Sequence, residues 1–115
     1  MAYEIYLTTA DSHPTASREL TDCQVVLSWD LQQHATLFCQ HKELLDNFPV
    51  TNGLSNYYGD VVYMGEEREE LKAELIALER SLADDPAACS VIAGILGVAE
   101  QAILMNKTIY GRSER

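Results

Sequence analysis

The chain has 115 residues, with 18 Asp and Glu against 8 Lys and Arg, which gives a formal net charge of -10. A chain of this length can bury one hydrophobic core, so we expect a single domain over residues 1–115. The acidic balance argues against a nucleic-acid-binding protein, because phosphate binding needs clustered Lys and Arg, and 47% hydrophobic residues argue against a disordered chain.

The N-terminal half is predicted to carry two strands. Residues 2–8 alternate loosely and are rich in β-branched and aromatic side chains, which is typical of a strand. Residues 9–21 collect turn-forming types and predict a loop. Residues 23–29 predict a second strand, and their continuous apolar centre favours an interior position in the sheet.

A shorter helix is predicted after the second strand. Asp30 is a favourable N-cap, and the apolar spacing after it predicts one helix over residues 31–48. Pro49 ends this helix, because the residue before a proline avoids helical geometry. Residues 54–58 predict one helical turn between two glycine-containing turns, and residues 61–64 predict a short strand.

Two long helices are predicted in the C-terminal half. A leucine stripe at helical spacing predicts the first of them over residues 66–82. Asp85 as N-cap and Pro86 at the first helical position begin the second, which ends near Asn106. Residues 107–110 predict a short closing strand or a tail. The stripe consists of Leu71, Leu75, Leu78 and Leu82.

Strands in the N-terminal half and long helices in the C-terminal half predict an α+β fold. We expect a small antiparallel or mixed sheet, two long C-terminal helices and one shorter helix after the second strand. Gly94 and Gly97 lie within the last predicted helix, where small residues let another helix or the sheet approach closely.

The sequence favours a cytoplasmic location. Its first residues lack the basic and apolar regions of a signal peptide. Cys23, Cys39 and Cys89 are odd in number and widely spaced, which favours free thiols in a reducing compartment. Residues 86–105 are long enough to span a membrane, but their Ala, Gly and Ser content and Glu100 favour a buried core helix. We therefore expect no membrane association.

Most of the excess negative charge lies in one segment. Residues 60–85 hold nine carboxylates and three basic side chains, a net charge of -6. Such a surface attracts a basic partner, while the alternative is a solvated helix face whose first-turn acids favour the helix dipole. The acids lie opposite the leucine stripe, which argues against an inward metal or acid–base site. The candidate partner-binding acids are Asp60, Glu66, Glu67, Glu69 and Glu70.

Three tyrosines lie beside this segment, namely Tyr57, Tyr58 and Tyr63. Tyrosine is favoured at protein interfaces, and tyrosines next to carboxylates suit a basic surface through cation–π and charge contacts. The alternative is that the rings cover the edge of the core while their hydroxyls stay in water.

A further constellation comprises His34, Cys39 and His41, with the two histidines on one face of the helix predicted over residues 31–48. Their spacing matches no standard zinc motif and no second ligand pair follows, so we expect no metal and no cofactor. No nucleophile elbow or phosphate-binding loop is present, so we expect no enzymatic activity. A small metal protein or enzyme that uses these three residues is the alternative.

A resemblance rests on three segments: Trp29-Asp30, Leu54-Ser-Asn-Tyr-Tyr-Gly-Asp-Val-Val-Tyr63, and Glu70-Leu71 through Glu74-Leu75. Over residues 24–105 the chain resembles small acidic bacterial proteins of unassigned function, some of which resemble the immunity proteins encoded beside toxins. The resemblance implies a non-enzymatic bacterial domain that binds a protein, and it assigns no role to any single residue.

Together these observations predict a cytoplasmic, non-catalytic, protein-binding domain that uses an acidic and tyrosine-bearing surface. In the immunity-like version its partner is a basic toxin. The alternative is a self-associating accessory subunit, such as a homodimer, with the apolar last helix as its interface.

Overall fold

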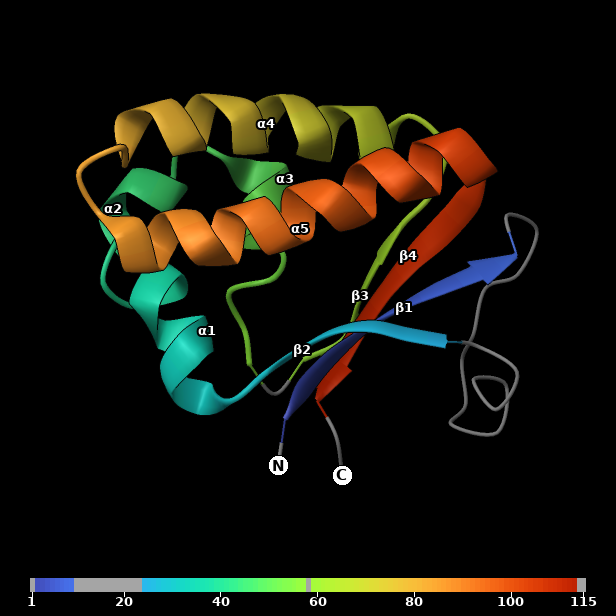
Figure 1. Cartoon of the computed structure of the whole chain (residues 1–115), viewed down its shortest axis with the longest axis horizontal. Helices are drawn as coiled ribbons and strands as arrows, with labels where there is room; N and C mark the ends of the chain where they lie inside the picture. Colours follow the sequence, from blue (N-terminus) through green and yellow to red (C-terminus); the bar gives the residue numbers. More distant parts are fainter. Residues whose placement is uncertain (1, 10–23, 58, 114–115) are drawn as a thin grey trace.

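The computed structural model describes residues 2–9, 24–57 and 59–113. It confirms the α+β fold: a four-stranded antiparallel sheet carries its helices on one face, and two of them are long (Figure 1). The strands are β1 (Tyr3–Thr9), β2 (Gln24–Trp29), β3 (Val61–Tyr63) and β4 (Lys107–Ser113). The helices are α1 (Leu31–Phe38), α2 (Lys42–Leu45), α3 (Pro49–Asn52), α4 (Glu67–Ser81) and α5 (Pro86–Met105).

The sheet order is β2-β1-β4-β3, so β2 lies at an edge and the prediction of an interior position is wrong. Strand β2 contains a bulge. Ile5 pairs with Leu27 while Tyr6 pairs with Val25, which leaves Val26 as an extra residue. Val26 and Leu27 both pack against the core, so a continuous apolar run is compatible with an edge strand.

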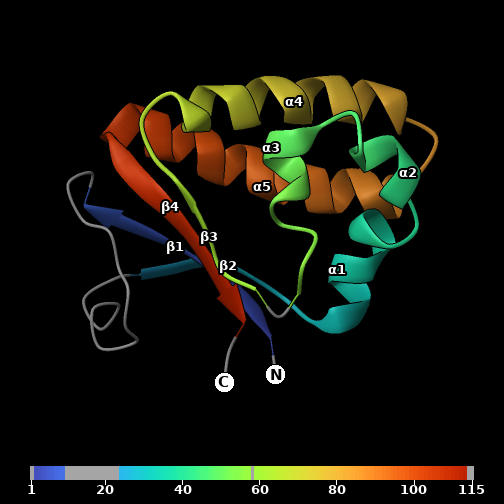
Figure 2. The ribbon, with the colours of Figure 1, turned by 180° about the vertical axis from the view of Figure 1, so that it is seen from behind.

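Strand β4 lies in the middle of the sheet, between β1 and β3 (Figure 2). It extends to Ser113, whereas the sequence predicted a short strand or a tail over residues 107–110. Gly111, Arg112 and Ser113 look like a polar tail, but antiparallel pairing with β1 and β3 satisfies the backbone of this segment. A central strand can therefore contain few apolar side chains.

The segment predicted as one helix over residues 31–48 forms two short helices, α1 and α2, followed by a turn that leads into α3. Asp30 is the predicted N-cap of α1, and it forms a capping box with Gln33. The break falls at His41, whose φ of -118° and ψ of 31° are not helical. Pro49 was predicted to end a helix, and in the structure it also begins α3. Residues 54–57 were expected to form a helical turn, but they lie outside any helix.

The two long helices form the second layer (Figure 2). The four leucines of the predicted stripe are all buried, and Asp85 and Pro86 begin α5 as expected. A Cβ on Gly94 would lie 3.3 Å from Leu27 Cδ1, so this glycine allows α5 to approach β2. A Cβ on Gly97 would meet nothing within 4 Å, so the expected close contact there is wrong.

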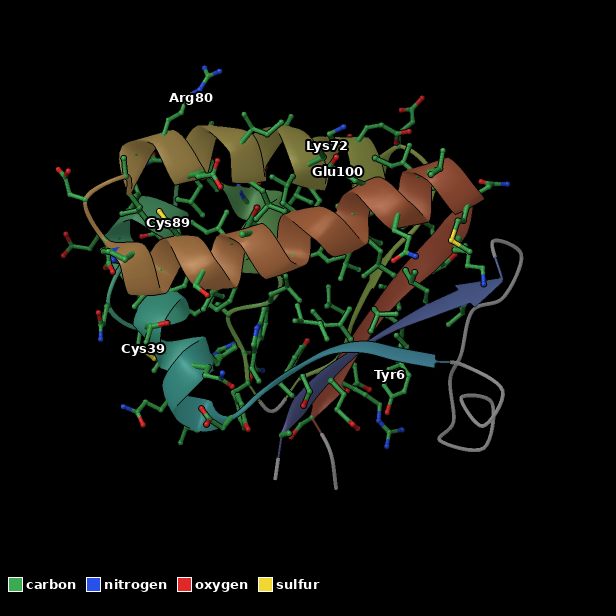
Figure 3. The ribbon with its side chains drawn as sticks, viewed as in Figure 1. Tyr6, Cys39, Lys72, Arg80, Cys89 and Glu100 are labelled. Carbon is green, nitrogen blue, oxygen red and sulfur yellow. The ribbon has the colours of Figure 1, made fainter. Side chains whose placement is uncertain are left out.

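Tyr3 is the largest of the core side chains that are fully buried. Its hydroxyl has no hydrogen-bond partner among the residues that the structure describes, and burial raises the pKa of this phenol. A Cβ on Gly111 of β4 would lie only 2.7 Å from this hydroxyl. Glycine at this position therefore makes room for the Tyr3 ring. Side chains alternate between the two faces along β1, and Tyr6 projects from the face opposite to Tyr3 (Figure 3).

Candidate functional site

The first two turns of α4 present the expected acidic surface. Glu66, Glu67, Glu69 and Glu70 are all exposed. The backbone N–H of Met64 donates to Glu67 Oε1 over 3.4 Å. The side chains of the other three make no hydrogen bond or ion pair with the described residues. Their charges are therefore available to a partner.

Not every acid of α4 faces solvent. The backbone N–H groups of Val50 and Thr51 donate to the carboxylate of Glu74, over 3.2 and 2.7 Å. These are the unpaired donors at the start of α3, and a carboxylate is their preferred partner. Glu74 therefore has a structural role, since it caps a short helix that the hydroxyl of Tyr63 also holds through Val50 O.

Arg68 lies among these acids in the sequence but turns into the protein, where its side chain is 9% exposed. Its guanidinium donates to the carbonyl oxygens of Gly65, Ala102 and Lys107, over 3.0, 3.2 and 2.9 Å, and to Asn106 Oδ1 over 3.3 Å. Arg68 thus joins the start of α4 to the end of α5 and the start of β4. The two helix ends lie at the same end of the molecule (Figure 1).

The end of α5 exposes two large apolar side chains at this place. Leu104 is 86% exposed and Met105 is 48% exposed. Asn106 follows in the left-handed conformation, with φ of 52°, and turns the chain into β4. We call the combined surface the acidic–apolar corner, and it consists of Glu66, Glu67, Glu69, Glu70, Leu104 and Met105.

Tyr57 and Tyr63 do not take part in this surface. They are only 5% and 3% exposed, so neither offers the exposed ring that the partner-binding prediction needs. The hydroxyl of Tyr63 donates to Val50 O over 2.6 Å, and Tyr57 packs edge-on against His34, with ring centroids 5.2 Å apart. Tyr58 lies outside the described residues.

Asp60 is exposed, but the structure separates it from the acids of α4. It precedes β3, whereas α4 follows the opposite end of that strand. The Tyr110 hydroxyl donates to Asp60 Oδ2 over 3.1 Å, on the side of the sheet that the helices leave free. Of the eight predicted partner-binding residues, the structure gathers the four glutamates.

The histidines and Cys39 do not converge. His34 is buried among aromatic rings, and its Nε2–H donates to Leu54 O over 2.7 Å. Cys39 is exposed, and His41 lies beyond the end of α1, so the expected shared face of the two histidines is wrong. Within residues 2–9, 24–57 and 59–113, no group of three or more His, Cys, Asp or Glu side chains is placed to hold a metal ion.

His41 instead links two distant segments. Its Nε2 lies 2.7 Å from Asp85 Oδ2, while Asp85 Oδ1 accepts from the N–H of Ala88 and caps α5. The hydrogen bond from His41 is the main cause that lowers the pKa of the Asp85 carboxyl. Both side chains are partly exposed, so this pair fixes the turn between α1 and α2 against the start of α5.

His34 is expected to make folding stability depend on pH. Burial lowers the pKa of this imidazole below its ordinary value of 6.5. Between these two pKa values the unfolded chain binds more protons than the folded one, so stability falls as pH drops below 6.5 and levels off below the folded pKa. Urea unfolding across this pH range should show a smaller loss of stability in His34→Gln than in the unmodified protein. An equal loss in both would contradict the assignment to His34.

The exposed end of α5 was missed by sequence reasoning, which assigned the whole helix to the core. The run Ile103-Leu104-Met105 was a signal of this exposure. Three consecutive helical residues cannot all face the core, so at least one apolar side chain must point to solvent. Among the described residues, α5 is the one helix long and apolar enough to cross a membrane; 39% of its 18-residue apolar window is buried. In the structure it packs against α4, α1 and the sheet.

Comparison of the chain with protein-family models, with curated proteins and with solved structures finds no match, so the candidate site stands on its own geometry.

Proposed function

We propose that this protein is a non-enzymatic domain that binds a basic protein partner through the acidic–apolar corner. One observation carries the proposal: Arg68 joins the start of α4, with its four exposed glutamates, to the end of α5, where Leu104 is 86% and Met105 48% exposed. Adjacent exposed apolar side chains with charged residues at the same end of the molecule suit a binding surface.

The chemistry of the corner specifies the partner. Four carboxylates in a chain of net charge -10 attract a positive surface and accelerate its association. Leu104 and Met105 offer apolar contacts that such a partner can cover, and the flexible thioether of Met105 adapts to its shape. A surface with Lys or Arg around an apolar side chain is the complement of this corner.

The narrower form of the proposal follows the resemblance to toxin-immunity proteins. In that form the protein acts in a bacterial cytoplasm and its partner is a basic toxin. Tyr57 and Tyr63 are no longer part of the proposed surface, because both side chains are buried. The acids of α4 and the end of α5 replace them.

A defined probe tests the corner. A helical peptide of Lys and Leu should shift the amide resonances of residues 64–70 and 103–107 in a saturable titration. Glu69→Lys with Glu70→Lys should weaken this binding about tenfold, since two attractive charges become repulsive. Leu104→Ser should weaken it about threefold to tenfold through lost apolar contact.

The matched control changes the same net charge elsewhere. Glu43→Lys with Asp84→Lys alters two exposed acids remote from the corner, and this pair should change the affinity less than about twofold. Equal weakening by both pairs would show a response to net charge alone and would contradict the corner.

The alternative of a self-associating subunit is favoured by one observation, the incomplete burial of α5. Sedimentation separates the two functions. If the protein is a dimer and Leu104→Asp converts it to a monomer, the exposed end of α5 binds a second copy of the chain. If the protein is a monomer at micromolar concentration, the self-associating function is excluded.

A further inference from the structure

A second surface feature lies at the opposite end of the molecule from the acidic–apolar corner. There, a cavity of about 310 Å³ opens between the end of α1, the short helix α2 and the turn after α3. Six residues line it: Phe38, Cys39, Lys42, Asp46, Asn52 and Ser55. Three separate helical segments therefore contribute to one small concave site of the size that binds small molecules.

One cation and one anion line the cavity, and neither is paired with another described residue. Lys42 begins α2 and Asp46 is its C-cap, and neither side chain makes a hydrogen bond or ion pair with the described residues. The sequence order explains why these two do not pair with each other, since a lysine four residues before an acid is the less favourable arrangement on a helix. Both charges remain free to bind an added molecule.

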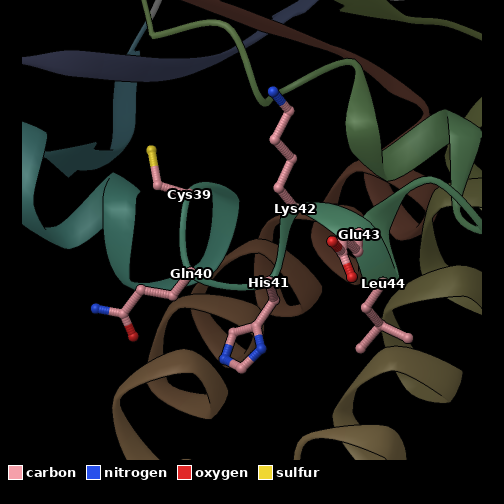
Figure 4. Close-up of a pocket in the computed structure, with 6 residues that line it drawn as sticks. All are labelled: Cys39, Gln40, His41, Lys42, Glu43 and Leu44. Carbon is pink, nitrogen blue, oxygen red and sulfur yellow. The ribbon is translucent and has the colours of Figure 1, made fainter.

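The side-chain directions separate this cavity from the His41 pair. Lys42 and Cys39 project to one side of the α1–α2 turn, whereas His41 projects to the opposite side, where Asp85 lies (Figure 4). The ammonium group of Lys42 therefore lies on the side of the turn away from the imidazole, although Lys42 and His41 both line a neighbouring cavity.

The remaining lining residues supply both apolar and polar surface. Phe38 is 3% exposed and contributes apolar surface to the lining. The side chains of Asn52 and Ser55 also make no hydrogen bond with the described residues, so an amide and a hydroxyl are available. An ammonium, a carboxylate, two neutral polar groups and an aromatic ring thus line the same space.

We propose that this cavity binds a small zwitterion, a free L-α-amino acid. The ligand's carboxylate pairs with Lys42, its ammonium group pairs with Asp46, and its side chain covers Phe38. A molecule with one charge alone leaves either Lys42 or Asp46 unpaired, and so binds less tightly. The site shares no residue with the acidic–apolar corner, so it is independent of the proposed partner binding.

The experiment is an amide-resonance titration of the full chain with single L-amino acids, with acetate and methylammonium as half-ligands. At least one neutral amino acid should shift residues 38–46 and 52–55 saturably, and more tightly than either half-ligand. Lys42→Met and Asp46→Asn should each weaken this binding about tenfold, as expected for one lost charge-assisted contact. Lys42 and Asp46 are both exposed, so the variants should keep the fold.

Matched controls neutralise one cation and one acid outside the cavity. Lys72→Met and Asp84→Asn should leave the titration unchanged. The proposal is overturned if no amino acid gives saturable shifts, or if acetate binds as tightly as the amino acids and Asp46→Asn has no effect, which would mark a simple anion site. Charge reversal at Glu69 and Glu70 should not change this titration, so the two proposals fail separately.

Discussion

Replacing Arg68 by methionine is expected to lower the free energy of unfolding by about 3 kcal/mol, because charge-assisted hydrogen bonds to buried oxygens are lost. The guanidinium donates to carbonyl groups of Gly65, Ala102 and Lys107 and to the side chain of Asn106. Methionine fills the space of the side-chain stem but removes all four hydrogen bonds. The carbonyl oxygens of Gly65 and Ala102 then keep only their backbone donors, the N–H groups of residue 68 and Asn106. The expected decrease in melting temperature is about 12 °C for a chain of this length.

Two further variants separate this effect from a general effect of charge. Arg80→Met removes an arginine that projects from α4 into solvent (Figure 3), and the expected change is within about 0.5 kcal/mol. Arg68→Lys keeps the charge but only part of the hydrogen bonding, so an intermediate stability is expected. Denaturant unfolding measures all three, and equal midpoints for Arg68→Met and Arg80→Met would contradict the structural role of Arg68.

Gly111→Ala is expected to lower the free energy of unfolding by about 2 kcal/mol, because the new methyl group overpacks the core. Its Cβ would lie 2.7 Å from the Tyr3 hydroxyl, 3.0 Å from Tyr3 Cε1 and 3.1 Å from Val61 Cγ1. Tyr3 is fully buried, so its ring can yield only by displacing other core side chains.

A double-mutant cycle tests the cause of this loss. In a Tyr3→Phe background the closest atom is gone, so the cost of Gly111→Ala should fall by about 1 kcal/mol. Tyr3→Phe alone should not destabilise the protein, since it removes a buried hydroxyl that has no partner. As a control, Gly97→Ala should raise stability by about 1 kcal/mol, because its Cβ meets open space on a helix. Additive effects of the two core changes would contradict the proposed overpacking.

The elements that depend on local patterns were predictable. The leucine stripe of α4 and the caps at Asp30 and Asp85 lie where sequence spacing and capping preferences place them. The break at His41 was not predictable, because apolar residues continue at helical spacing through it, and its partner Asp85 is 44 residues away. The edge position of β2 was likewise hidden, because a bulge lets both Val26 and Leu27 pack against the core and so produces the apolar run of an interior strand.

The candidate site was predictable in part. Four glutamates lie on the exposed face as their spacing indicated, but the neighbouring tyrosines belong to the core. One available signal was Arg68, which precedes Leu71 by three residues and so extends the leucine stripe toward the start of α4. An arginine at a core position requires buried acceptors, and here the end of α5 provides them.

The central position of β4 has a consequence for the order of folding. Strands β1 and β3 make no ladder with each other, and both pair with residues 107–113. In β1 the first partner pair joins Tyr3 to Ser113, a separation of nearly the whole described chain. Such distant pairing makes sheet assembly slow relative to helix formation. During synthesis the helices and the β1–β2 ladder can form early, but β3 cannot join the sheet until residues 107–113 leave the ribosome. The part of α5 that packs against β4 therefore stays uncovered until then.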